Sequence, residues 1–222
     1  MASDKAQIAS IKSLIETDFE ARRQQLDLDK KTFGLSESES FSSAILGDGV
    51  PYYVISSGKL AFQGYIFPIK VGNKPAGIAE AVFFQGKWMI VSMTNILTFE
   101  QELSDAKTLA NAPAKLVYDP RYQLFGLVTE NPAGNSIILM RDSLMLNLKK
   151  SDIKNFQETI DSINQLGNSN NLQSEWYKAG GIGVSSKNES ADTGTKILII
   201  ALSVFALSIG VIVFRKRKQS FH

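Results

Sequence analysis

Apolar residues recur every three or four positions in several parts of the chain, which is the spacing of one face of an α-helix. This spacing predicts amphipathic helices over residues 5–26 and 151–166. Thr98, with Gln101 three residues later, has the form of a capping box. It predicts the start of a middle helix that ends near residue 111.

Short runs of apolar and aromatic residues between these helices predict β-strands. Gly72-Asn73 and Gln85-Gly86 join three of the runs as tight turns, which indicates an antiparallel meander. The predicted strands cover residues 52–56, 65–71, 77–84, 87–93, 115–118, 123–129 and 135–140. Residues 30–48 are polar and are expected to be loop. The pattern predicts an α+β domain over residues 1–166, with a mainly antiparallel sheet packed with N-terminal, middle and C-terminal helices.

The apolar pattern changes completely near the C-terminus. Residues 197–214 are 18 consecutive residues without a charge. A helix of that length spans roughly 27 Å, close to the hydrocarbon thickness of a bilayer. We therefore expect one transmembrane helix over residues 196–214, so the lipid bilayer is a predicted partner. Residues 167–195, rich in Gly, Ser and Asn, are expected to form a flexible polar stalk, and residues 215–222 a basic tail.

Charge sets the expected orientation of this helix. The chain carries a net charge of +2, of which the tail residues Arg215, Lys216, Arg217 and Lys218 contribute four positive charges, so the rest carries −2. The domain thus lacks a general attraction to phosphate, and we expect no nucleic-acid partner. Because positive flanks stay in the cytoplasm, the four cations should stop transfer and leave the domain extracytoplasmic at the cell membrane.

The first residues raise an alternative to this orientation. Residues 1–12 contain Asp4, Lys5 and Lys12 and lack the apolar region of a signal peptide. Either a signal peptide has been removed from this sequence, or the domain is cytoplasmic on a tail anchor. We favour the first, because a start of Met-Ala-Ser before an amphipathic helix is compatible with trimming.

The residues around the predicted span have the order of a known sorting signal. Asp192, Thr193 and Gly194 precede the span, and the basic run follows it. This order resembles the cell-wall sorting signal of Gram-positive surface proteins, a Leu-Pro-x-Thr-Gly pentapeptide followed by a hydrophobic span and a basic tail. The resemblance implies a sortase that cleaves between Thr193 and Gly194 and joins the threonine to the cell wall. Ser190 and Ala191 replace Leu and Pro, so we expect simple membrane retention, with sortase processing as the alternative.

Composition restricts the chemistry that the chain can perform. It contains no cysteine, and its one histidine is His222 at the end of the tail. Thiol nucleophiles, zinc–thiolate sites and histidine triads are therefore excluded, and we predict no catalytic, cofactor-binding or metal-binding residue. Two hydrolase alternatives stay open. Ser151-x-x-Lys154 has the bare spacing of a Ser–Lys pair, but we interpret it as a helix N-cap and a solvated lysine. Carboxylates that could form a pair are Glu80, Glu100, Glu102, Asp105, Asp119 and Glu130.

Aromatic residues are dense in the predicted meander. They are Tyr52, Tyr53, Phe62, Tyr65, Phe67, Phe83, Phe84 and Trp88. Neighbours in a strand point to opposite faces, so one member of each adjacent pair should leave the core unless both faces are covered. We predict a binding surface of Tyr52, Tyr53, Phe83, Phe84 and Trp88, with the core of the sheet as the alternative role for these rings.

These patterns together predict a non-enzymatic, membrane-anchored extracytoplasmic module that binds a protein, peptide or cell-envelope component. The alternatives are a surface hydrolase that uses carboxylates or a Ser–Lys pair, and a cytoplasmic tail-anchored adaptor.

Overall fold

The computed structural model describes residues 2–130 and 134–168. The chain divides after Gln165 into two units, and the elements below belong to the first, with the last helix crossing the boundary. The predicted span and basic tail lie outside the described residues, as does the predicted stalk from residue 169 onward. Among the described residues, no helix has the length and apolar character needed to cross a membrane.

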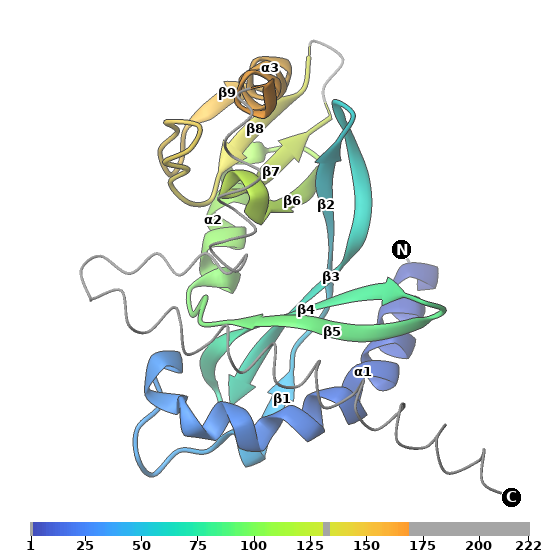
Figure 1. Cartoon of the computed structure of the whole chain (residues 1–222), viewed down its shortest axis with the longest axis vertical. Coiled ribbons are helices and arrows are strands. Elements are labelled where there is room, and N and C mark those ends of the chain that lie inside the picture. Colours follow the sequence, from blue (N-terminus) through green and yellow to red (C-terminus); the bar gives the residue numbers. More distant parts are fainter. Residues whose placement is uncertain (1, 131–133, 169–222) are drawn as a thin grey trace, which may run out of the picture. The chain divides into compact units, whose positions relative to one another are not determined.

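Within residues 2–130 and 134–168, nine strands form one mainly antiparallel sheet (Figure 1). They are β1 (Ala44–Leu46), β2 (Val50–Ser56), β3 (Lys59–Val71), β4 (Lys74–Phe84), β5 (Lys87–Thr94), β6 (Ala114–Asp119), β7 (Leu124–Thr129), β8 (Ser136–Leu139) and β9 (Ile153–Asn155). The order is β5-β4-β3-β2-β6-β7-β8-β9, and β1 pairs with β3. The predicted meander is confirmed, because β3, β4 and β5 are consecutive antiparallel neighbours.

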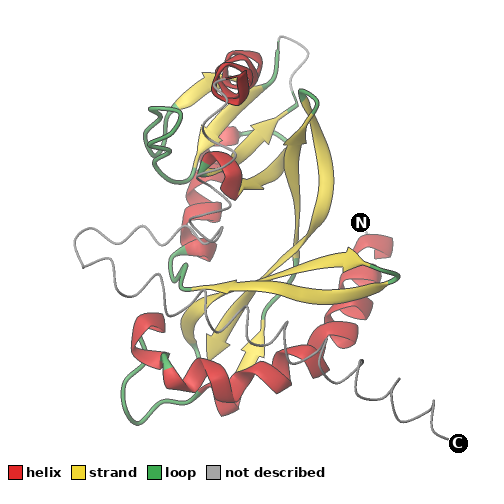
Figure 2. Cartoon of the chain, viewed as in Figure 1, coloured by secondary structure: helices red, strands yellow, loops and turns green. Residues whose placement is uncertain are grey.

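Both faces of the sheet are covered by helices, which are α1 (Ala2–Leu28), α2 (Phe99–Ala110) and α3 (Phe156–Asn168) in the described part of the chain (Figure 2). Tyr65 and Ile66 are neighbours on β3; Tyr65 packs in the cluster beneath α1 and Ile66 in the cluster beneath α2. Leu116 and Val117, neighbours on β6, pack beneath α2 and α3 in the same way. Because neighbours point to opposite faces, α2 covers one face, and α1 and α3 cover separate parts of the other.

The two halves of the sheet meet at β2 and β6, which are parallel. Tyr52 pairs with Leu116 and Tyr53 with Val117. Beyond these two pairs, side chains connect β2 to the end of β6. The fully buried carboxylate of Asp119 accepts a hydrogen bond from the Ile55 backbone N–H at 3.1 Å. Arg121 donates to the Ile55 carbonyl at 2.8 Å and pairs with Asp119 at 2.7 Å. An ion pair therefore takes the place of further backbone pairing at this junction.

The middle helix begins where it was predicted, but without the predicted capping box. Thr98 is the N-cap residue, yet its side chain makes no capping hydrogen bond and donates instead to Glu102 at 2.7 Å. Gln101 bonds Asp105 at 2.7 Å rather than turning back to Thr98. The expected loop over residues 30–48 also contains β1 and two short 3-10 turns.

The last helix was predicted to begin too early. Ile153–Asn155 form β9, which pairs with β8, and α3 begins at Phe156. The Asn155 side chain caps this helix by accepting the backbone N–H of Gln157 at 2.8 Å. Ser151 lies before β9 with a left-handed φ of 66°, so its interpretation as a helix N-cap was wrong. The Ser–Lys spacing thus joins a turn to a strand.

Candidate functional site

In the described part of the chain, five aromatic rings form a continuous row across β2, β3, β4 and β5. In order they are Tyr53, Phe62, Tyr65, Trp88 and Phe83, and we call them the aromatic row. Successive ring centroids are 5.8, 5.4, 5.5 and 5.6 Å apart, in edge and tilted contacts typical of aromatic pairs. The row lies on the face that carries α1 and α3, because Tyr65 and Trp88 pack in the α1 cluster. At its other end the ammonium of Lys115 lies 5.5 Å from the Tyr53 ring centroid.

The row leads from the core to the surface. Tyr65 in its middle is 7% exposed, whereas Phe62 is 49% and Phe83 59% exposed. Single exposed apolar residues are normal on soluble proteins, but rings that form a contiguous series anchored in the core need an explanation. The buried rings hold the exposed ones in fixed positions, so the row is a rigid apolar surface.

The β4–β5 hairpin ends in a second apolar feature, residues 83–88, which we call the hairpin tip. Phe83 pairs with Trp88 and Phe84 with Lys87 across a two-residue turn. Gln85 and Gly86 in this turn both have positive φ, as a type I′ turn requires. Phe84 is 54% exposed and, as the neighbour of Phe83, points to the opposite face of the hairpin.

The structure places the five predicted surface residues in three settings. Tyr53, Phe83 and Trp88 come together in the aromatic row. Phe84 is exposed on the other face of the hairpin tip. Tyr52 is fully buried, with its ring 5.9 Å from that of Tyr118, and does not reach the surface.

Phe62 belongs to the row although the pattern did not single it out. Strict alternation along β3 would put Phe62 and Tyr65 on opposite faces. The pairing with β2 shifts between Tyr52 and Tyr53, which face Gly64 and Phe62, so one extra residue stands in β3. This bulge turns Phe62 onto the face of Tyr65. The sequence signal that could have indicated this bulge is Gly64, which follows Phe62 by two positions within a long strand.

A polar cluster lies on the opposite face of the sheet. The Tyr52 hydroxyl donates to the largely buried carboxylate of Glu80. Burial raises the pKa of Glu80, and the Tyr52 hydrogen bond acts in the opposite direction. Burial, with the nearby charge of Glu80, also raises the pKa of Tyr118 to about 12. Burial also raises the pKa of Tyr52. The hydroxyls of Tyr52 and Tyr118 therefore stay protonated near neutral pH, and Tyr52 remains a donor to Glu80.

Replacement of Glu80 by glutamine tests this cluster. Because the folded pKa is raised, the contribution of Glu80 to stability is fully present below its unfolded pKa and is lost as pH rises through the folded value. Glutamine keeps an oxygen that accepts from Tyr52 but carries no buried charge. We expect Glu80→Gln to unfold at higher urea concentration than the wild type at pH 7, and at the same concentration at pH 4. An equal difference at both pH values would contradict this.

The six carboxylates considered for hydrolysis each have a partner in the fold. Glu80 accepts from Tyr52, Glu100 pairs with Lys70, Glu102 with Arg141, Asp105 accepts from Gln101, Asp119 pairs with Arg121, and Glu130 with Lys115. Each of these carboxylates therefore contacts a neighbouring side chain of the fold. Among residues 2–130 and 134–168, no group of three or more His, Asp or Glu side chains is placed to hold a metal ion.

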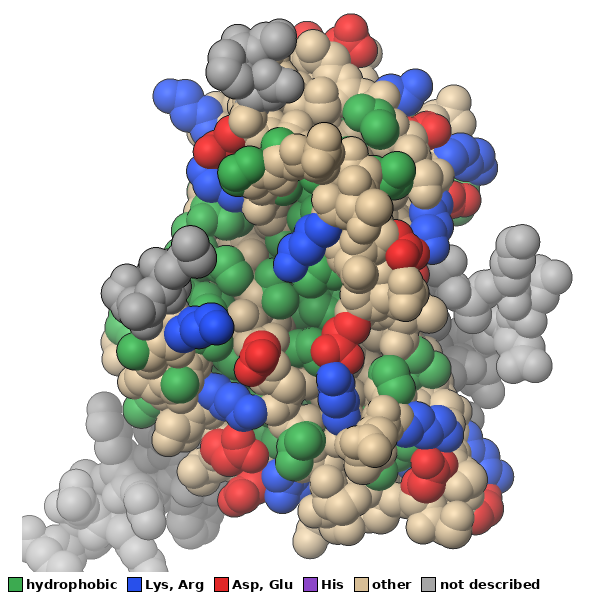
Figure 3. Space-filling model, turned by 180° about the vertical axis from the view of Figure 1, so that it is seen from behind, with side chains coloured by type: hydrophobic (Ala, Val, Ile, Leu, Met, Phe, Trp, Pro, Cys, Tyr) green, Lys and Arg blue, Asp and Glu red, His purple; other side chains and the backbone are tan. Residues whose placement is uncertain are grey.

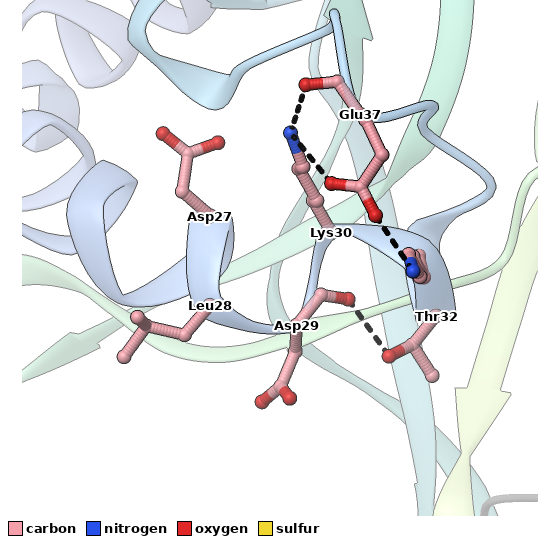
Figure 4. Close-up of a pocket in the computed structure, with 7 residues that line it drawn as sticks. Asp27, Leu28, Asp29, Lys30, Thr32 and Glu37 are labelled. Carbon is pink, nitrogen blue, oxygen red and sulfur yellow. Dashed lines mark hydrogen bonds and ion pairs between the residues drawn. The ribbon is translucent and has the colours of Figure 1, made fainter.

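A surface hollow lies at the end of α1, lined by Asp27, Leu28, Asp29, Lys30, Lys31, Thr32 and Glu37 (Figure 4). Its charged groups bind one another. Lys30 donates to the backbone carbonyls of Glu37 and Glu39 at 2.6 and 3.0 Å, and Lys31 pairs with Glu37 at 2.6 Å. Asp27 accepts the backbone N–H of Phe41 at 2.7 Å. These bonds tie the loop after α1 to the helix, so the hollow serves the fold.

Apolar surface is also visible on the face seen from behind, where green side chains gather through the middle with charged side chains around them (Figure 3). The aromatic row and the hairpin tip nevertheless offer the best-defined apolar geometry, since each exposed ring has a named packing partner or strand register.

Comparisons of the chain with models of protein families, with curated protein sequences and with solved structures find no match.

Proposed function

We propose that the protein is a non-enzymatic module, anchored by one C-terminal helix on the outer side of a cell membrane, that binds a cell-envelope component or polypeptide through its aromatic row and hairpin tip. The contiguous aromatic row carries the proposal. Tyr65 and Trp88 pack in the α1 core, whereas Phe62 and Phe83 of the row are 49% and 59% exposed. Phenylalanine offers no polar atom, so these two exposed rings suit an apolar partner surface.

Three features of the sequence support the anchor. Residues 197–214 carry no charge, four cations follow them, and the rest of the chain carries a net −2. The polar stalk predicted over residues 167–195 would then connect the domain to the span. A flexible chain of that length has an end-to-end distance of roughly 30 Å, which allows the domain to work close to the membrane surface.

We propose no enzymatic activity because of the composition of the chain and the contacts of its carboxylates. The domain has no cysteine and no histidine before His222, and its six candidate carboxylates are held by structural partners. The resemblance of the C-terminal segment to a sorting signal implies an alternative, in which a sortase attaches Thr193 to peptidoglycan.

Charge placed in the middle of the predicted span tests the anchor. Leu202→Arg with Leu207→Arg costs about 2.5–3.5 kcal/mol per residue for membrane insertion. We expect the wild-type chain to stay in the membrane fraction after an alkaline carbonate wash and the double variant to be released. Leu202→Ile with Leu207→Ile is the matched control and should be retained. A wild-type chain recovered in the soluble fraction without detergent would contradict the anchor, and protease added to intact cells tests the outer location.

A further inference from the structure

The hairpin tip exposes apolar rings on both of its faces. Phe83 and Phe84 are neighbours in β4 that point in opposite directions, and each is more than half exposed. A partner that docks on one face of the hairpin could cover only one of these rings. A medium that surrounds the tip covers both. We propose that the hairpin tip inserts into the lipid surface of the membrane that holds the protein.

The composition of the tip fits the membrane interface. Residues 83–88 contain two Phe, one Trp and one Lys, and no Asp or Glu. Phenylalanine favours the acyl region, tryptophan favours the boundary with the headgroups, and a lysine can extend its ammonium toward lipid phosphates. Pairing of β4 with β5 continues to Phe84 and Lys87, so the backbone groups between the two strands are bonded to each other at the tip. A shallow position among the headgroups leaves the outer edges of the two strands hydrated.

The shape of the β4–β5 hairpin allows this contact. It extends beyond the neighbouring strands of the sheet (Figure 1). The middle of β5 is fixed by α1, where Asp18 accepts the Ile90 backbone N–H at 2.8 Å and Arg22 donates to the Ile90 carbonyl at 2.9 Å. These two side chains also occupy the backbone groups that an added peptide strand would need at Ile90, which argues against strand addition along β5.

This inference rests on the proposed function: the envelope component at the hairpin tip is the bilayer lipid itself, and the anchor keeps the tip near it. A flexible stalk up to residue 195, as predicted from the sequence, would keep the domain within roughly 30 Å of the span on average. At such a distance a tip with weak affinity for lipid is still bound much of the time, since the second contact is intramolecular. The anchor and the tip are then two membrane contacts of one chain.

The test uses the full chain in vesicles of phosphatidylcholine and phosphatidylglycerol. Trp176→Phe leaves Trp88 as the single tryptophan, and lipids brominated on their acyl chains quench tryptophan that enters the bilayer. We expect brominated lipid to lower Trp88 fluorescence about twofold, and Phe83→Ser with Phe84→Ser to abolish that loss. Phe62→Ser, in the row but outside the hairpin tip, is the matched control and should keep the loss of fluorescence. Urea unfolding checks that each variant is folded.

The same samples are also washed with carbonate. Retention after the wash then reports on the anchor, and quenching of Trp88 reports on the tip. Chain retained after the wash without quenching of Trp88 would overturn the tip insertion and leave the anchor standing. Chain released by the wash but quenched before it would support the tip and contradict the anchor. Shielding of Trp88 from a water-soluble quencher that increases with chain concentration, without quenching by brominated lipid, would indicate a second copy and would overturn the proposal.

Discussion

Replacement of Gly64 by alanine is expected to lower the free energy of unfolding by about 3 kcal/mol. Gly64 lies in β3 between Tyr52 of β2 and Val82 of β4. A Cβ atom at this position would collide with the backbone carbonyl oxygen of Ala81 and would lie 3.3 Å from the Tyr52 ring. A backbone group cannot move away by changing rotamer, so β3 and β4 would have to separate at the centre of the sheet.

Gly72→Ala is the matched control for this substitution. Gly72 has a φ of 59° in the β3–β4 turn, and a Cβ atom there meets nothing within 4 Å. It should cost about 1 kcal/mol, the price of a left-handed conformation alone. The measurement is urea unfolding of the full chain in mild detergent, followed by tryptophan fluorescence. Equal losses for the two variants would show that β3 and β4 move apart easily, against the close approach described here.

The elements that were predicted well are those specified by local patterns. Ile11, Ile15 and Phe19 form the buried face of α1 at the spacing that predicted the helix. The turns at Gly72 and Gly86 predicted the meander, since two-residue turns with glycine leave few alternatives to an antiparallel hairpin. Bounds at these places differ from the prediction by only a few residues, apart from the first part of β3.

The elements that were missed depend on residues far apart in the chain. β9 forms because Ile153–Asn155 lie beside β8, although Ile153 fits the helical spacing of the residues after it. The bulge that brings Phe62 into the aromatic row requires the register of β2 against β3. Parallel pairing of β2 with β6 joins residues more than 60 positions apart and has no turn signal between them. Four of the six aromatic residues in the row and the hairpin tip were therefore predictable from the sequence, whereas Phe62 and Tyr65 needed the register of the sheet.

Loss of the Asp119 carboxylate is expected to destabilise the junction between the two halves of the sheet. Asp119→Ala leaves the buried N–H of Ile55 without its acceptor and Arg121 without its partner. An orphaned buried donor costs about 1–3 kcal/mol, and a broken ion pair adds less than in a fully buried pair because Arg121 is half-exposed. We expect a total loss of about 2–4 kcal/mol in the free energy of unfolding.

Two variants separate the parts of this effect. Asp119→Asn retains an oxygen for the Ile55 N–H and should lose less than Asp119→Ala. Glu100→Ala removes the carboxylate of the Lys70 ion pair, which is exposed, and should lose less than about 1 kcal/mol. Urea unfolding measures the free energy of unfolding of all three variants. A loss for Asp119→Ala no larger than that for Glu100→Ala would contradict the stabilising role of Asp119 at the junction. Because β2 and β6 share so little backbone pairing, the Asp119→Ala chain should also unfold less cooperatively, with the β1–β5 half and the β6–β9 half separating into two transitions.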